Sequence, residues 1–180
     1  PVEPRIIHEA MDVTQGKLSM GFRCATDDVP AMILANLLFG GTSNSKLFMN
    51  VRERLSLCYY ASSSYARSKG IMTVSSGVEQ KDYDRAVEEI TRQLTAVQNG
   101  DWEDWEQQGA LQAMLSSLTS LPDSQSALEN YYLGQIATDC DETPEQLARA
   151  LREVTKERIM AAAQSARLDT VYFLHGKEEA

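Results

Sequence analysis

The sequence predicts an α+β fold in which helices stack on one face of a largely antiparallel sheet. Extended segments lie near both ends of the chain and in a hairpin pattern before its middle, whereas the second half is mostly helical. Strands and helices that come in separate runs are typical of an α+β domain. With 180 residues the chain is long enough for one sizeable core, so we expect a single domain over residues 1–180.

Two extended segments open the chain, at Arg5–Met11 and Gln15–Ala25. In the second segment apolar side chains alternate with polar ones or glycine between Lys17 and Cys24. A period of two indicates a strand with one buried face.

A deeply buried helix is expected next. Acidic residues precede it, Pro30 suits its first turn, and its body, Ala31–Phe39, is apolar nearly all round. Gly40 and Gly41 predict its end, because glycine readily adopts the left-handed conformation that closes many helices.

A second helix, Ser45–Leu55, carries an apolar stripe with Arg52 at its edge. An edge position lets a guanidinium point toward a cleft while its stem packs. A hairpin follows, in which Leu57–Ala66 pairs with Gly70–Val78. Alternation along the first of these strands puts Tyr59 and Tyr60 on opposite faces, so only one of them can share a site with Arg52.

The remainder of the chain predicts a run of helices and a closing strand at Thr170–Leu174. A clear helical stripe from Tyr83 ends at Asn99 and Gly100, and the later helices are expected at Asp101–Ser120, at Ser124–Thr138, from Thr143 and from Thr155 to near Leu168. In the helix Ser124–Thr138, the residues expected to face inward are Leu128, Tyr131 or Tyr132, and Ile136.

Composition excludes several classes of partner. The net charge of −9 argues against nucleic acid and anionic membranes, and no apolar run approaches the roughly 20 residues of a membrane span. The three cysteines are far apart and form no C-x-x-C pair, which favours reduced thiols in the cytoplasm. The polar start, without an initiator Met or a signal-peptide core, predicts a processed chain or a part of a longer protein.

Patterns for metal binding and nucleophilic catalysis are weak. His8 and His175 fall in separate predicted strands, and neither zinc-peptidase histidine motif is present. A Cys–His pair stays open because such partners meet only in the fold, although Cys58 has the apolar neighbours of a buried thiol. Arg52 and Tyr59 suit the holding of a peptide carbonyl or an oxyanion; alternatively, Arg52 pairs with a surface carboxylate and Tyr59 packs at the core edge.

The stretch around these two residues closely resembles the second domain of the pitrilysin/insulinase family of zinc peptidases. The family pattern is a glycine pair, then Ser-x-Leu-Phe, then Arg-Glu-x-x-x-Leu-x-Tyr. This chain has Gly40-Gly41, Ser45-Lys46-Leu47-Phe48 and Arg52-Glu53-Arg54-Leu55-Ser56-Leu57-Cys58-Tyr59, with Ser56 where the family often has glycine. The resemblance runs from Gln15 to Leu174 and is closest to bacterial, cytosolic processing-peptidase-like proteins.

The resemblance implies a processing-peptidase-like metallohydrolase half. The family builds a clamshell from related α+β halves, one of which carries H-x-x-E-H and zinc. The other half is metal-free and holds the substrate backbone, a role that the resemblance gives to Arg52 and Tyr59. Residues 1–180 would then be the non-catalytic C-terminal half of a longer, cytoplasmic protein, with no catalytic residue and no metal ligand of its own. Its partners would be a peptide substrate and the missing N-terminal half or a homologous subunit, and zinc is expected in the other half if the full protein is active.

Two alternatives stay open. The parent protein can lack zinc in both halves and serve as a non-enzymatic scaffold or as the partner subunit of an active homologous peptidase. The chain can also be an independent hydrolase that uses Cys58 or His175. The first alternative depends on whether H-x-x-E-H occurs outside these residues, and the second on what the fold brings together.

Overall fold

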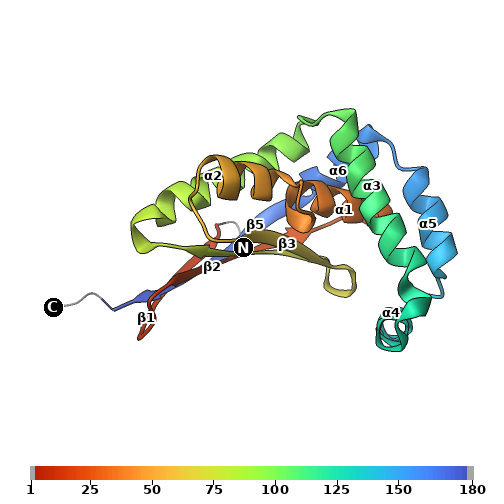
Figure 1. Ribbon diagram of the computed structural model, residues 1–180, viewed down its shortest axis with the longest axis horizontal. Helices are drawn as coiled ribbons and strands as arrows, with labels where there is room; N and C mark the ends of the chain where they lie inside the picture. Colours follow the sequence, from red (N-terminus) through yellow and green to blue (C-terminus); the bar gives the residue numbers. More distant parts are fainter. Residues whose placement is uncertain (1–2, 178–180) are drawn as a thin grey trace.

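The computed structural model describes residues 3–177 and has the expected α+β architecture. A five-stranded sheet has the order β1-β5-β2-β4-β3, in which β5 runs parallel to β1 and the other neighbours are antiparallel. In Figure 1 most of the helices stand over one face of this sheet. The strands are β1 (Arg5–Met11), β2 (Gly16–Cys24), β3 (Ala61–Ala66), β4 (Ile71–Val78) and β5 (Ala166–Gly176).

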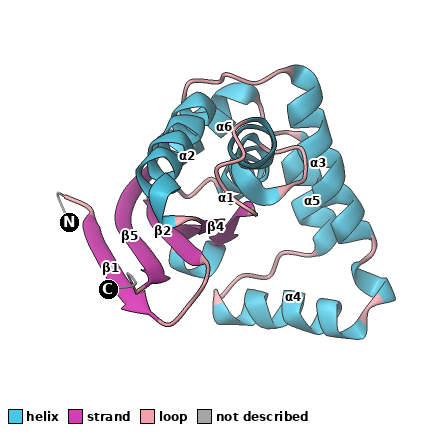
Figure 2. Ribbon diagram, turned by 60° about the vertical axis from the view of Figure 1, so that its left-hand side comes forward, coloured by secondary structure: helices cyan, strands magenta, loops and turns pink. Residues whose placement is uncertain are grey.

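The described part of the chain has six α-helices, and all of them except α4 form the second layer. Figure 2 shows α1 and α6 at the centre of this layer, between α2 on one side and α3 with α5 on the other, while α4 lies apart from them. Their bounds are α1 (Val29–Asn36), α2 (Tyr83–Gln98), α3 (Asp104–Thr119), α4 (Gln125–Ala137), α5 (Pro144–Arg152) and α6 (Lys156–Gln164). None of these described helices is long and apolar enough to cross a membrane.

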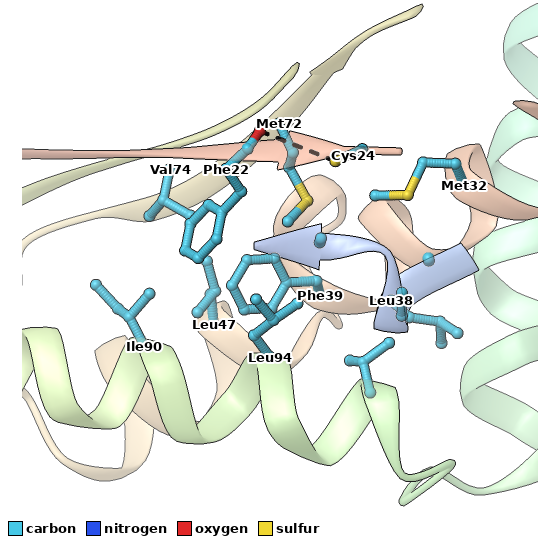
Figure 3. Packing of buried hydrophobic residues seen from close by; sticks show 14 of the residues in the cluster. Phe22, Cys24, Met32, Leu38, Phe39, Leu47, Met72, Val74, Ile90 and Leu94 are labelled. Atoms are coloured by element: carbon cyan, nitrogen blue, oxygen red, sulfur yellow. Dashed lines mark hydrogen bonds between the residues drawn. The ribbon is translucent and has the colours of Figure 1, made fainter. Parts of the chain in front are cut away.

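The core lies between the sheet and the helices. The rings of Phe22 on β2 and Phe39 meet edge to face, with their centroids 6.4 Å apart. Figure 3 shows Ile90 and Leu94 of α2 reaching the same cluster, with Leu47 beside them. The alternating side chains of β2 are buried on this face, as the period of two predicted.

Two strand boundaries differ from the sequence-based expectation. The last strand begins at Ala166, so α6 ends at Gln164 and not near Leu168. The reason is that β5 is a central strand, which pairs with β1 on one side and with β2 on the other, where Cys24 faces Ala166. Strand β3 begins at Ala61, four residues later than expected, because Leu57 to Tyr60 form an irregular link from the preceding helix.

The glycine pair has a different purpose from the one predicted. Gly40 and Gly41 lie in a π-helical segment, Leu37–Gly41, that continues α1, and neither has a positive φ. A Cβ atom on Gly40 would lie 2.6 Å from Leu47 Cδ1 and 2.7 Å from both the backbone N and the Oγ of Ser63. Glycine is therefore required here by close packing of the helix on β3.

The expected inward face of α4 is right for Tyr131, which is half-buried and packs against the core, but wrong for Ile136. Ile136 is 76% exposed, and Leu133 beside it is 61% exposed. Gln135 is the helix residue that is buried. Propensity and periodicity identified the helix correctly, but the tertiary arrangement leaves Tyr132, Leu133 and Ile136 exposed.

Candidate functional site

Arg52 lies on a π-helical segment, Leu47–Arg54, where the sequence predicted an α-helix. Leu47 and Val51 are fully buried and anchor this segment to the core. The Arg52 guanidinium lies 4.6 Å from the centroid of the Phe48 ring, and its Nη1 is 3.5 Å from Glu53 Oε1. The aromatic ring supports the cation from one side. The Arg52 side chain remains 40% exposed, so its N–H groups can reach a ligand.

A sharp turn follows the helix and centres on Ser56, whose φ is +50°. The turn is closed by backbone hydrogen bonds from Ser56 N to Arg52 O (3.1 Å) and from Leu57 N to Val51 O (3.0 Å). A positive φ of this size favours glycine, which fits the glycine that the family often has where this chain has Ser56.

Tyr59 lies in the irregular link that precedes β3. Its backbone N donates to Gly77 O at 2.9 Å, which ties it to the end of β4. Its side chain is exposed, and its hydroxyl donates to Glu79 Oε1 at 3.0 Å. This hydrogen bond and the negative charge of Glu79 raise the pKa of the Tyr59 phenol above its usual value. Lys81 Nζ lies 2.6 Å from Glu79 Oε2, and its hydrogen bond is the main cause of a lowered pKa for Glu79.

Arg52 and Tyr59 line one open cavity of about 410 Å³. The helix end supplies one wall, the link before β3 supplies another, and the connection from β4 to α2 supplies the third. The lining residues are Arg52, Glu53, Ser56, Leu57, Cys58, Tyr59, Glu79 and Asp82. The structure therefore brings the two predicted residues to one place, together with three carboxylates.

Tyr60 is outside the group that lines this cavity, as expected, but strand alternation is not the reason. Its ring packs over Gly77, where an added Cβ would lie 2.7 Å from Tyr60 Cε1. Its carbonyl accepts hydrogen bonds from Ser76 Oγ (2.8 Å) and Gly77 N (3.2 Å). These contacts hold Tyr60 against β4, while the Tyr59 side chain lines the cavity and reaches Glu79.

Sequence reasoning missed Glu79 and Asp82. Both follow β4, more than 20 residues after Arg52, and no local motif marks them. A partial signal was available, because the predicted β3–β4 hairpin places the residues after β4 beside those that precede β3. The hydrogen bond between Tyr59 and Glu79 is the outcome of that pairing.

Metal ligands do not gather in the described part of the chain. Among residues 3–177, no group of three or more His, Cys, Asp or Glu side chains could hold a metal ion. The two histidines do come together: the parallel pairing of β1 and β5 brings the ring centroids of His8 and His175 to 6.1 Å, in a cluster with Tyr83 and Phe173.

The structure gives no support to a Cys–His hydrolase. His175 lines a cavity between β5 and α2, whereas Cys58 lines the cavity of Arg52 and Tyr59. Burial raises the pKa of the Cys58 thiol, which keeps it protonated and a poor nucleophile.

Comparison with known proteins identifies the class of this domain. Residues 1–114 match the model of the peptidase M16 inactive domain. The chain therefore belongs to this family. It is 38% identical to the "Probable inactive metalloprotease YmfF" of Bacillus subtilis (strain 168), across 99% of this chain and 43% of that protein.

Solved structures agree on the fold. A conserved protein from Enterococcus faecalis V583 superimposes with a TM-score of 0.91 and 28% sequence identity, over 100% of this chain and 44% of that one. A protease from Helicobacter pylori gives a TM-score of 0.82 with 14% identity, over 95% of this chain and 43% of that one. The chain thus spans less than half the length of these relatives.

Proposed function

We propose that this domain is the metal-free, substrate-binding half of a zinc-peptidase-like protein and that it holds the backbone of a peptide substrate. The observation that supports this proposal is the shared cavity of Arg52 and Tyr59. A guanidinium offers a rigid set of N–H donors, and a phenol offers one O–H donor. Together they suit a peptide carbonyl and the negative charge that develops on it during hydrolysis.

The residues themselves define how the site works. Arg52 is already exposed and oriented by Phe48, so it can donate to a carbonyl oxygen without rearrangement. Tyr59 donates its one proton to Glu79, so the hydroxyl must leave that carboxylate before it can donate to a substrate. Zinc in a companion half would polarise the scissile carbonyl and activate water. The described residues offer no ligand set for zinc, and the chemistry proposed for this chain is binding alone.

The same proposal extends to the whole protein. Residues 1–180 form the C-terminal half of a longer polypeptide, paired with an N-terminal half or a homologous subunit, in the cytoplasm. The support is the partial coverage of the relatives and, for the compartment, three cysteines that are all free. By itself the chain is expected to hydrolyse no peptide.

Arg52→Ala in the complete polypeptide tests the proposal. Removal of a donor to the developing charge costs about 3 kcal/mol of transition-state stabilisation, whereas an exposed side chain changes folding stability by less than about 0.5 kcal/mol. We expect kcat/KM for a peptide to fall by about 100-fold while the free energy of unfolding stays the same. Arg54→Ala is the matched control, because Arg54 is an exposed arginine on the same helix and lines a different cavity. Equal losses of activity in both variants would contradict the assignment.

A second candidate function is that of a non-enzymatic scaffold or partner subunit of an active homologous peptidase. The observation that favours it is the name of the Bacillus subtilis relative, which describes that protein as probably inactive. The sequence outside residues 1–180 distinguishes the two candidate functions. An H-x-x-E-H motif there, together with stoichiometric zinc in the complete polypeptide, favours the peptidase, and the lack of both favours the scaffold.

A further inference from the structure

Helix α4 buries a polar side chain and exposes most of its large apolar side chains. Gln135 is its buried residue, and the Oε1 atom of that side chain has no hydrogen-bond partner among residues 3–177. On the outer side, Tyr132, Leu133 and Ile136 are 44%, 61% and 76% exposed. A helix of a globular protein normally does the reverse and turns its apolar stripe toward the core. Within the described residues, the exposed apolar side chains of α4 therefore have no apolar surface that covers them.

The outer side of α4 forms one continuous surface. A shallow hollow of about 440 Å³ is lined by Leu128, Glu129, Tyr132, Leu133 and Ile136, which we call the α4 face. Glu129 carries the one charge on this helix, and Gln125 Nε2 donates to its Oε1 at 2.8 Å. In a chain with a net charge of −9, a helix with one charged side chain fits an apolar partner surface better than a charged one.

Polar contacts hold α4 in a defined position. The Tyr131 hydroxyl donates to the carbonyl oxygen of Glu142 at 3.1 Å. Arg67, in the turn between β3 and β4, donates to Glu142 Oε2 and to Cys140 Sγ, both at 3.2 Å. These bonds join the end of α4 and the segment after it to the sheet. The α4 face is thus presented in a fixed orientation rather than on a free arm.

We propose that the α4 face docks on the companion half, by which we mean the chain outside these 180 residues in a polypeptide as long as the relatives. Those relatives are more than twice as long as this chain, so they contain a tethered partner of the required size. The area of the face argues for tethering. Five side chains are far fewer than the 20 to 30 residues, or about 800 Å² per partner, of a stable complex between separate chains. A covalently joined partner has an effective concentration of about a millimolar and needs much less contact area.

This inference rests on the proposed two-half organisation, but its test does not use peptide binding. Amide hydrogen exchange over residues 125–137 is measured in the complete polypeptide and in the 180-residue chain. We expect exchange in α4 to be slower by about tenfold or more in the complete polypeptide, because docking suppresses local opening. Leu133→Gln with Ile136→Gln, made in the complete polypeptide, should return the exchange to the rate of the shorter chain.

Trp105→Gln is the matched control. Trp105 is an exposed apolar residue on α3, 60% exposed, and lies outside the α4 face. Its substitution should leave the slow exchange of α4 unchanged. Equal exchange in the complete polypeptide and the 180-residue chain would overturn the proposal. Slow exchange in the 180-residue chain with a dimeric mass by light scattering would also overturn it, because a second copy would then cover α4. If Arg52→Ala leaves activity unchanged while α4 shows the expected exchange, the proposed function fails and the docking surface stands.

Discussion

Tyr59 has one hydroxyl proton, and Glu79 accepts it. The bond has two effects that oppose each other. It fixes the position of the phenol in the cavity that Arg52 also lines, and it raises the pKa of the phenol above its ordinary value of 10. It also occupies the donor that a substrate carbonyl would need. In the proposed function, Glu79 positions Tyr59, and this contact would have to break for Tyr59 to donate to a peptide.

Glu79→Gln tests this role of Glu79. The amide can still accept the hydrogen bond, but it carries no charge, so the pKa of Tyr59 should fall toward its ordinary value near 10. The measurement is an ultraviolet titration of the tyrosines, in which the difference from the same variant with Tyr59→Phe isolates Tyr59. Lys81→Gln is a useful comparison, because it leaves the carboxylate in place and should not lower the pKa. An unchanged Tyr59 titration in Glu79→Gln would contradict the assigned contact.

At the residue scale, the sequence identified Arg52 and Tyr59 as candidate site residues but did not identify the residues that surround them in the cavity. Arg52 was predicted from its position at the edge of an apolar stripe, Tyr59 from its position early in a predicted strand, and both from the family pattern that contains them. Glu79 comes from a segment that is distant in sequence and has no motif. Its approach to Tyr59 depends on the irregular link before β3, in which Ser56 has a positive φ and Tyr59 N donates to Gly77 O.

At the scale of elements, the junction between the helices and β3 depends on Gly40. An added methyl group would clash with Leu47 and with the backbone of Ser63, and the backbone cannot move aside cheaply. Gly40→Ala should therefore lower the free energy of unfolding by about 1–3 kcal/mol, measured by urea denaturation. Gly109→Ala is the matched control, because a Cβ there has no neighbour within 4 Å in the interior of α3. It should raise stability by about 0.5–1 kcal/mol. The same sign for both variants would contradict this reading of the glycines.

A second prediction at this scale concerns the join between α1 and α6. Asp28 caps α1 by accepting from Ala31 N at 3.2 Å, and it pairs with Arg158 of α6 through bonds of 2.8 and 2.9 Å. The hydrogen bond from Arg158 is the main cause of a lowered pKa for Asp28. A lowered folded-state pKa stabilises the fold above the ordinary value near 3.8, and the gain disappears as the pH falls through the lower folded value.

Asp28→Asn keeps the cap and removes the charge. Because both side chains are partly exposed to water, we expect a loss of no more than about 1 kcal/mol at about pH 7. The difference from the unmodified chain should shrink as the pH falls from the ordinary value of 3.8 through the lowered folded-state pKa of Asp28, measured by urea unfolding across the pH range. Asp27→Asn controls for net charge, since Asp27 is exposed and lies beside the cap. A loss that stays constant with pH would show that charge pairing is not its source.

Comparison of the elements with the sequence-based expectations shows which parts of the fold follow from local sequence patterns. The alternation in β2, Pro30 in the first turn of α1 and the stop at Asn99 and Gly100 were all readable, because each depends on neighbouring residues. The π-helical segments and the late start of β3 were not, because they result from tertiary packing around Gly40 and Ser56. The exposure of the apolar side of α4 could not be predicted either. Periodicity identifies an apolar face of a helix but not the surface that covers it.

At the scale of the whole molecule, the domain presents two separate surfaces with different chemistry. One is the polar cavity of Arg52 and Tyr59, and the other is the apolar α4 face. The family match covers the part of the chain that contains the cavity and ends before α4. A binding half that holds a peptide at one surface and docks on its companion through another accounts for both.

The most direct test of the central claim is the affinity of this chain for an extended peptide. A fluorescein-labelled, unstructured decapeptide with no charged side chains is titrated against the chain and its variants, and binding is followed by anisotropy. A hydrogen bond from a charged donor is worth about 1.5–3 kcal/mol when it is lost, so Arg52→Ala should weaken binding by at least about tenfold. Tyr59→Phe should weaken binding less, since it removes a neutral donor, while Arg54→Ala and Tyr60→Phe should leave the affinity unchanged. Binding that is equally strong in Arg52→Ala and Arg54→Ala would contradict the account.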